Sequence, residues 1–385
     1  MITPFRIAVP DAALDDLHAR LAATRWAALL PDADWRYGAD PVYLRALCAY
    51  WRDGFDWRAR EAALNAFPQY LASIDGLDIH FIHARGKGPD PLPLIVTHGW
   101  PSTFAEFTKL IPLLTDPVAY GGRAEDSFDV VAPSLPGYGF SGMPQRPGTT
   151  SRGIARLWLA LMHSLGYDAF VAHGGDIGAG VTNHLGRIGG GHVRAIHVMA
   201  APYDVDRESP SLSDAEREYV DVLEAWEREE GAYEHQQRTR PHTLSLALND
   251  SPAGLAAWII EKWRSWSDCG GDVESSFSKD ELLTNVSIYW LGATIGSSAQ
   301  IYYDSAHAGL PRPPRIGIPA RLFLSRETVN RCPREWAARS YANPSYGLAP
   351  AGGHFMSAER PDLLAADLRD WFRRFRTCRG PTNGG

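Results

Sequence analysis

An aspartate lies at the centre of the glycine-rich pentapeptide Gly174-Gly175-Asp176-Ile177-Gly178. A short apolar run precedes it and a helical pattern follows it, which is the context of a sharp strand-to-helix turn that projects its central side chain. Flanking glycines avoid the collisions that larger side chains would make there, and the helix N-terminus favours an ionised carboxylate. The pattern predicts that Asp176 is a nucleophile. The alternative is a glycine-rich turn in which Asp176 only caps the helix.

A second candidate loop has the sequence HGWP and follows another apolar run. In a sheet that carries a nucleophile turn, the loop after a neighbouring strand donates one backbone N–H to the oxyanion, and the residue after the nucleophile donates the other. We therefore expect the N–H groups of Trp100 and Ile177 to form an oxyanion hole. His98 and Pro101 are candidates for the substrate site, and Pro101 also fixes φ and directs the chain away from it. An ordinary tight turn is the alternative.

The base and its orienting acid are expected later in the chain. His354 lies in the loop GGHF, just before the C-terminal helical pattern. The order nucleophile, acid, histidine is that of α/β hydrolases, so His354 is the predicted base. Glu327 follows the predicted strand that ends near Ser325 and would orient and stabilise the imidazolium. Asp204, which follows an earlier strand, is the second candidate for the acid.

A carboxylate nucleophile suits attack at a saturated carbon that carries a leaving group, because it forms an alkyl ester there. Water activated by His354 would then hydrolyse that ester. An epoxide oxygen needs an acid as it leaves, for which tyrosine hydroxyls are suited, whereas a halide needs only N–H donors. Trp258, Trp263 and Trp266 therefore leave a hydrolytic dehalogenase as one alternative, although such a stripe also suits a helix core. A non-catalytic binding protein on the same scaffold is another.

Helices and strands must position these candidate residues, and the sequence also predicts those elements. Apolar runs alternate with helical patterns, which indicates a mostly parallel, doubly wound α/β sheet. Buried strands are expected at 92–97, 129–133, 169–172, 193–199 and 321–324. The first 85 residues read as amphipathic helices, and residues 206–300 read as a helical insertion that would cover the strand ends as a lid. The expected parts are an N-terminal region at 1–85, core segments at 86–205 and 301–385, and the lid at 206–300.

Composition excludes several function classes. The net charge is −7 and the basic residues are scattered apart from a short cluster near the C-terminus, so no nucleic-acid partner is expected. No stretch approaches the ~20 apolar residues that span a bilayer, and the N-terminus lacks a secretory pattern, so we expect a soluble, cytoplasmic protein. Neither a metal nor a cofactor is expected, and apolar lid surface would suit a homodimer. The cysteines, widely spaced, are expected to be free thiols: Cys48, Cys269, Cys332 and Cys378.

Over nearly its whole length the chain resembles the microsomal-type epoxide hydrolases, including the juvenile hormone branch. The likeness is carried by RIAVPDAALDDLHARLAATRW, YWRDGFDWRAREAALNAFPQY, HGWPST, PSLPGYGFSG, GGDIG, ALNDSPAGLAAWIIEKW, DELLTNVSIYW and GGHF. The N-terminal region and the ALNDSP motif are not shared with dehalogenases. The resemblance implies an α/β-hydrolase fold, an N-terminal region that wraps core and lid, and hydration of an epoxide to a vicinal diol through an aspartyl ester.

The resemblance also implies two lid tyrosines that donate to the epoxide oxygen. They fall on Tyr233, before the ALNDSP motif, and on Tyr302, with the adjacent Tyr303 as the alternative if the register shifts. In the family the acid usually lies five residues before the proline of a P-x-x-W segment. That place is held here by Thr328, and Glu327 is one residue earlier, so Glu327 requires a loop longer by one residue.

The membrane-anchor helix of the microsomal enzymes has no counterpart in the sequence, which favours a soluble bacterial type. The chain is similar to actinomycete enzymes, among them those that open epoxides in enediyne antibiotic biosynthesis. The resemblance therefore implies a small-molecule epoxide and water as partners, in secondary metabolism or in detoxification.

Overall fold

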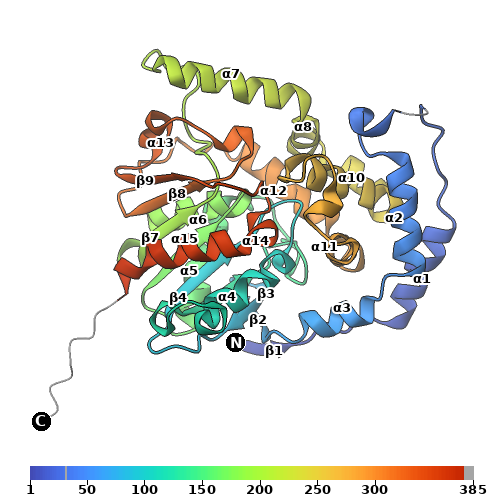
Figure 1. The fold of residues 1–385 in the computed structure, drawn as a ribbon, viewed down its shortest axis with the longest axis horizontal. Coiled ribbons are helices and arrows are strands. Elements are labelled where there is room, and N and C mark those ends of the chain that lie inside the picture. Colours follow the sequence, from blue (N-terminus) through green and yellow to red (C-terminus); the bar gives the residue numbers. More distant parts are fainter. Residues whose placement is uncertain (31–32, 377–385) are drawn as a thin grey trace, which may run out of the picture.

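Within residues 1–30 and 33–376, which a computed structural model describes, nine strands form one sheet (Figure 1). Their spatial order is β1-β2-β3-β5-β4-β6-β7-β8-β9. The strands are β1 (Ile2–Phe5), β2 (Gln69–Ile74), β3 (Leu77–Ala84), β4 (Leu92–Thr97), β5 (Phe128–Pro133), β6 (Phe170–Gly174), β7 (Val193–Val198), β8 (Ala320–Leu324) and β9 (Pro344–Leu348). Strands β1, β2, β3 and β5 pair antiparallel, and every other pairing is parallel. The mostly parallel sheet is confirmed.

The chain reverses direction across the sheet at β4. This strand lies between β5 and β6, so the chain passes first to one side of β4 and then crosses to the other. In open parallel sheets, ligand sites form beyond the carboxyl ends of the strands at such a reversal. β4 ends at Thr97 and β6 ends at Gly174, so the HGWP loop and the turn of Asp176 begin at this place.

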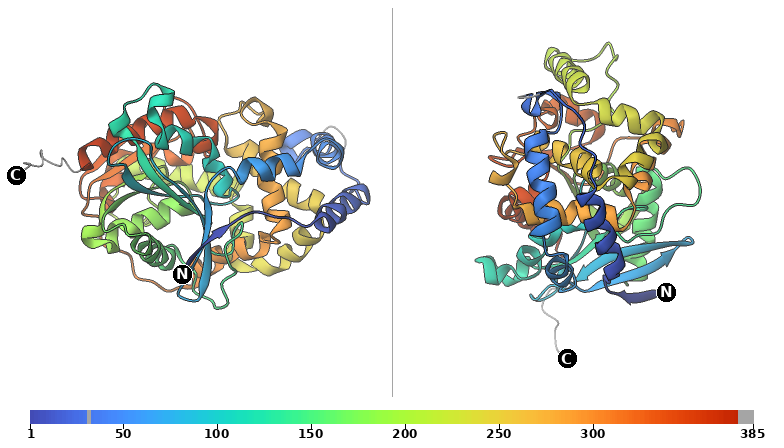
Figure 2. Two further views of the ribbon diagram at one scale, coloured as in Figure 1. Left: turned by 90° about the horizontal axis from the view of Figure 1, so that it is seen from below. Right: turned by 90° about the vertical axis from the view of Figure 1, so that its right-hand side faces the viewer.

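Helices cover both faces of the sheet. α4 (Leu110–Thr115) and α15 (Pro361–Phe372) pack together over one face, and α5 (Ser151–Ser164) and α6 (Ile177–Ile188) pack together over the other (Figure 2). Thr150 caps the N-terminus of α5, since its hydroxyl accepts a 3.2 Å hydrogen bond from the N–H of Gly153. Of two shorter helices, α13 (Arg334–Ser340) packs against β9 and α14 (Met356–Glu359) packs against α15.

The expectation that the first 85 residues are helical is wrong for three segments. α1 (Asp11–Ala22), α2 (Pro41–Asp53) and α3 (Trp57–Leu64) are helices, but β1, β2 and β3 join the sheet. Asp75 and Gly76, with φ of 50° and 78°, form the two-residue turn between β2 and β3, and Asp-Gly is a hairpin signal that helical periodicity does not reveal. The sequence also did not predict β9, because its residues are mostly half-buried and do not form an apolar run.

A run of helices fills the chain between β7 and β8. They are α7 (Asp214–Glu229), α8 (Ala232–Thr239), α9 (Pro241–Asp250), α10 (Pro252–Trp266), α11 (Lys279–Leu291) and α12 (Ile295–His307), so the run continues past the expected limit at residue 300. The blue helices α1 and α2 lie along its outer side (Figure 1). The indole N–H of Trp51 donates to Ser287 at 3.0 Å, which ties the N-terminal region to α11.

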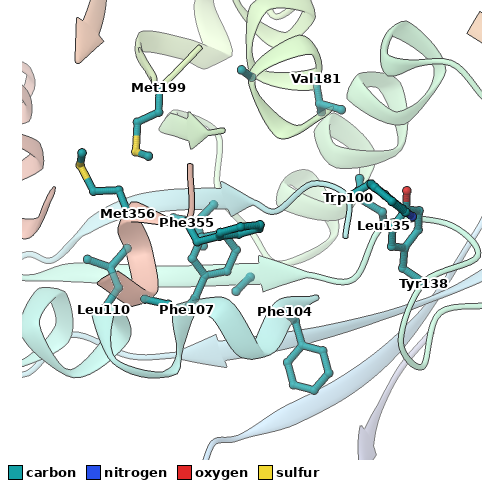
Figure 3. Packing of buried hydrophobic residues seen from close by; sticks show 14 of the residues in the cluster. Trp100, Phe104, Phe107, Leu110, Leu135, Tyr138, Val181, Met199, Phe355 and Met356 are labelled. Carbon is teal, nitrogen blue, oxygen red and sulfur yellow. The ribbon is translucent and has the colours of Figure 1, made fainter. Parts of the chain in front are cut away.

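One buried cluster joins the loops that end the strands. Trp100, Phe104 and Phe107 come from the segment after β4, Met199 follows β7, and Phe355 follows the predicted base (Figure 3). Because well-packed interiors resist displacement of single side chains, this cluster holds the loops of the candidate site in one arrangement.

Candidate active site

Asp176 occupies a strained backbone position at the start of α6. Its φ of 50° and ψ of −127° lie in a backbone region that residues other than glycine rarely adopt. A Cβ on Gly174 would lie 2.2 Å from the carbonyl oxygen of Gly178, and a Cβ on Gly178 would lie 1.9 Å from that of Thr97. Both flanking glycines are therefore required by close packing, as the pentapeptide predicts.

The HGWP loop approaches the Asp176 carboxylate from β4. The N–H of Trp100 donates to Oδ1 of Asp176 at 2.8 Å, and the N–H of Ile177 also hydrogen bonds to the carboxylate. A Cβ on Gly99 would lie 2.2 Å from the same Oδ1, so only glycine leaves room for this contact. The structure thus brings together the two N–H groups that were expected to form an oxyanion hole.

His354 lies on the other side of the carboxylate. Its Nε2 is 3.6 Å from Oδ2 of Asp176, and its Nδ1 is 2.9 Å from Oε2 of Glu327. The end of α10 positions this loop, because the N–H of His354 donates to the carbonyl of Trp266 at 2.9 Å. A Cβ on Gly353 would lie 2.4 Å from that carbonyl oxygen, so the glycine permits the approach.

Of the two candidate acids, Glu327 is the one that reaches His354. The side-chain amide of Asn330 donates to Oε2 of Glu327 at 2.7 Å and thereby fixes the carboxylate. A 3-10 turn over Thr328–Asn330 directly follows Glu327. Asp204 instead pairs with Arg187 and accepts a hydrogen bond from Ser340, so it lies in a separate ion pair.

The charges of the site are coupled. Burial raises the pKa of Asp176, against the lowering effects of His354 and of the Ile177 and Trp100 N–H groups. Burial alone would lower the pKa of His354, but Glu327 and Asp176 together raise it to about 9. At neutral pH the site therefore holds an imidazolium between carboxylates.

Tyr233 of α8 and Tyr302 of α12 meet above Trp100. The ring of Tyr233 stacks on the indole of Trp100 with centroids 4.9 Å apart, and the ring of Tyr302 lies edge-on to that indole at 6.2 Å. The two tyrosine rings are 6.1 Å apart. Burial raises the pKa of both hydroxyls well above 10, so both keep their protons. Tyr303 is not brought to this group, since it is 37% exposed and its ring stacks on His307.

His98 and Pro101, which were predicted for the substrate site, hold the HGWP loop in place. The N–H of Leu135 donates to Nε2 of His98 at 3.2 Å, and burial lowers the pKa of that imidazole to about 4. The carbonyl of Pro101 accepts hydrogen bonds from the amide of Asn285 at 2.7 Å and from the indole of Trp263 at 3.3 Å. These contacts join the loop to α10 and α11.

Two of the three tryptophans that favoured a dehalogenase donate their indole N–H groups within the protein. The indole N–H of Trp263 donates to Pro101, and that of Trp266 donates to Glu230 at 3.3 Å. The buried indole N–H of Trp258 has no hydrogen-bond partner in the described residues.

One residue near the reacting groups was not predicted. Glu106 lies in the 3-10 helix Phe104–Thr108, and its carboxyl borders a small cavity together with Asp176 and His354. A single glutamate in an otherwise apolar segment carries no recognisable motif, so only the fold reveals this placement.

The described part of the chain also bears on the cysteines, on metal-binding groups and on membrane-spanning helices. Cys48, Cys269 and Cys332 are free and buried, and Cys378 lies outside the described residues. Across residues 1–30 and 33–376 no group of three or more histidine, cysteine, aspartate or glutamate side chains is placed to hold a metal ion. Over the same ranges, no helix has the length and apolar character required to cross a bilayer.

Comparisons with known proteins show which families the chain resembles. Residues 2–107 match a family model described as the epoxide hydrolase N terminus, and residues 93–292 match one described as the alpha/beta hydrolase fold. A protein of Stigmatella aurantiaca is 45% identical over 97% of this chain and 86% of its own length. Epoxide hydrolase 1 of Sus scrofa is 35% identical over 96% of this chain and 88% of its own length.

Solved structures show the same likeness. The epoxide hydrolase of Aspergillus niger superposes with a TM-score of 0.85 at 32% identity, covering 97% of this chain and 96% of that chain. The juvenile hormone epoxide hydrolase of Bombyx mori superposes with a TM-score of 0.87 at 26% identity, covering 98% of this chain and 95% of that chain.

Proposed function

Because the chain belongs to the epoxide hydrolase family, we propose that it hydrates an epoxide to a vicinal diol through an ester between the substrate and Asp176. The observation that carries this proposal is the asymmetry of the carboxylate. Oδ1 is bound by the N–H of Trp100 at 2.8 Å, whereas Oδ2 faces His354 at 3.6 Å. One oxygen is thus held where an oxyanion would develop, and the other is left to attack.

In the first step, Oδ2 attacks a ring carbon and the carbon–oxygen bond of the epoxide breaks. The departing oxygen takes a proton from Tyr233 or Tyr302, whose raised pKa values keep them protonated until that moment. The stacking of Tyr233 on Trp100 sets the distance between this donor and the nucleophile. In this proposal the helices α7 to α12 act as the lid that holds the donors.

In the second step, His354 takes one proton from water, and the water oxygen attacks the carbonyl carbon of the Asp176 ester. Negative charge moves to Oδ1, where the N–H groups of Trp100 and Ile177 stabilise it. Collapse breaks the ester bond, and the departing alkoxide takes a proton from His354. The second water proton restores the tyrosine, so the protein returns to its initial state.

The substrate class follows from resemblance alone. We propose an epoxide of secondary metabolism, as in enzymes of enediyne biosynthesis, with detoxification as the other role. Comparing kcat/KM for a polycyclic epoxide and for small aryl epoxides would separate these roles, since a detoxifying enzyme accepts both.

The test of the reaction is a parallel assay of the purified protein with styrene oxide and with 1-bromobutane. We expect diol without halide, and loss of diol formation in Asp176→Ala. Halide without diol would replace the proposal by a dehalogenase. If neither product forms and mass spectrometry finds no ester on Asp176, a binding protein on this scaffold is the better description.

A further inference from the structure

A small cavity reaches the two central residues of the site without reaching the tyrosines. Asp176, His354, Ser102, Glu106 and Ser357 are part of its wall, but neither Tyr233 nor Tyr302 is. It has room for about one water molecule. The side of Asp176 that this cavity borders is therefore suited to water rather than to the epoxide.

Glu106 supplies the one carboxyl group among the described lining residues of this cavity that the proposed reaction leaves unused. The hydroxyl of Ser102 donates to its Oε2 at 2.6 Å, and Ser357 also hydrogen bonds to its carboxyl. Glu106 raises the pKa of His354, yet in the described chain only Asp176 and Glu327 pair with that imidazole within 4 Å. Polar groups that are too far apart for a direct hydrogen bond are commonly bridged by water.

A larger cavity lies on the other side of Glu106. Its empty space, with the adjoining open solvent included, is about 700 Å³, and Glu106 borders both cavities. Polar groups around it include Arg60, Lys109 and Asn285, and the side-chain oxygen of Asn285 is buried without a hydrogen-bond partner in the described chain. Most of the lining is nevertheless apolar, with Leu64, Phe67, Trp263 and Phe277 among its residues.

We propose that Glu106 positions the water that hydrolyses the Asp176 ester. The carboxyl of Glu106 accepts a hydrogen bond from one water proton while His354 removes the other. The lone pair of the oxygen is thereby directed at the carbonyl carbon of Asp176. Glu106 undergoes no net change of protonation. This inference rests on the proposed ester mechanism.

Glu106→Leu tests the inference, because it removes the acceptor and preserves much of the side-chain volume. Rapid-quench mass spectrometry with styrene oxide gives the rates of ester formation and ester hydrolysis separately. We expect unchanged ester formation and hydrolysis slower by about 100-fold, as misplacing one reactant costs about that much. In the steady state kcat and KM should fall together, leaving kcat/KM unchanged.

Two variants separate positioning from support of the fold. Glu106→Gln keeps an oxygen that accepts the hydrogen bond and should recover most of the hydrolysis rate. Glu281→Leu removes a carboxylate that borders only the larger cavity and pairs with Lys109, and it should accumulate no ester. If Glu106→Leu does not fold, Glu106→Asp withdraws the carboxyl by one methylene and should slow hydrolysis selectively.

The inference is wrong if the folded Glu106 variant hydrolyses the ester at the wild-type rate. It is also wrong if ester formation and hydrolysis slow in equal proportion. A failure of the ester mechanism itself would look different, because then no ester would accumulate in His354→Gln either.

Discussion

The N–H of Trp100 and Oδ1 of Asp176 are 2.8 Å apart, in a contact that exists before any substrate binds. Since Oδ1 is held, rotation of the carboxylate is restricted and Oδ2 remains the attacking atom. The same contact places Oδ1 where negative charge would develop during ester hydrolysis. A single hydrogen bond thus prepares both steps of the proposed reaction.

Replacing the base should separate the two steps. His354→Gln lacks a group that can deprotonate water, so we expect ester formation to continue and turnover to fall by about 10³-fold, within the range of general-base catalysis. Intact-mass spectrometry should show the protein plus one substrate, and peptide mapping should place the addition on Asp176. A variant that turns over at the wild-type rate would remove His354 from the mechanism.

The source of the oxygen atoms gives an independent check. If water attacks the carbonyl carbon of the ester, its oxygen enters Asp176 rather than the diol. A single turnover in ¹⁸O-labelled water, with enzyme in excess, should therefore label the peptide that contains Asp176 and leave the diol unlabelled. Label in the diol after one turnover would mean that water attacks the epoxide directly.

The two buried tyrosines should act in the first step. Tyr233→Phe and Tyr302→Phe each remove one donor to the departing oxygen, and we expect kcat/KM to fall by about 100-fold in each, with a larger loss in the double variant. Tyr303→Phe is the matched control, because Tyr303 is adjacent in sequence but stacks on His307 away from the site. A loss in the control equal to that in Tyr302→Phe would contradict the assignment.

The rate of ester hydrolysis should rise with pH, because only neutral His354 can accept a proton from water. In the free protein Glu327 and Asp176 raise the pKa of His354 to about 9. Ester formation removes the charge of Asp176, so the midpoint of the hydrolysis profile should lie below 9. Glu327→Gln removes another raising charge and should shift the midpoint to still lower pH, while the plateau falls by about 10²-fold or more.

Single-turnover hydrolysis rates between pH 5 and pH 10 give both midpoints. Asp204→Asn is the control, since Asp204 pairs with Arg187 rather than with His354 and its loss should leave the midpoint in place. A midpoint that responds to Asp204→Asn and not to Glu327→Gln would reverse the choice of acid.

Gly99→Ala should abolish activity without unfolding the protein. The added Cβ would lie 2.2 Å from Oδ1 of Asp176, so the carboxylate must leave its hydrogen bond to Trp100. Gly317→Ala serves as the control because a Cβ there meets no atom within 4 Å. Thermal unfolding of both variants, measured beside ester formation, distinguishes a displaced nucleophile from a damaged fold. Normal ester formation in Gly99→Ala would contradict the packing argument.

Local patterns in the sequence determined much of this site. Gly174 is needed for its close approach to Gly178, four positions later, and Gly178 for its close approach to Thr97 of the neighbouring strand, so the pentapeptide alone identifies the turn. Alternating apolar runs likewise predicted the parallel strands, because burial on both faces leaves a continuous apolar signature. The order of Asp176, Glu327 and His354 along the chain follows from the same strands.

Tertiary structure decided what depends on contacts between distant segments. The antiparallel strands β2 and β3 are stabilised by pairing with each other and with β1 and β5, which periodicity in one segment does not encode. The direction of a helix face brought Tyr302 rather than Tyr303 to Trp100. Packing of the loops after three strands brings Glu327 to His354, whereas Asp204 pairs with Arg187. The same packing places Glu106 beside the nucleophile. Residue types and spacing thus determined which groups are present, and the packed fold decided which of them meet, because distances across a site depend on non-local contacts.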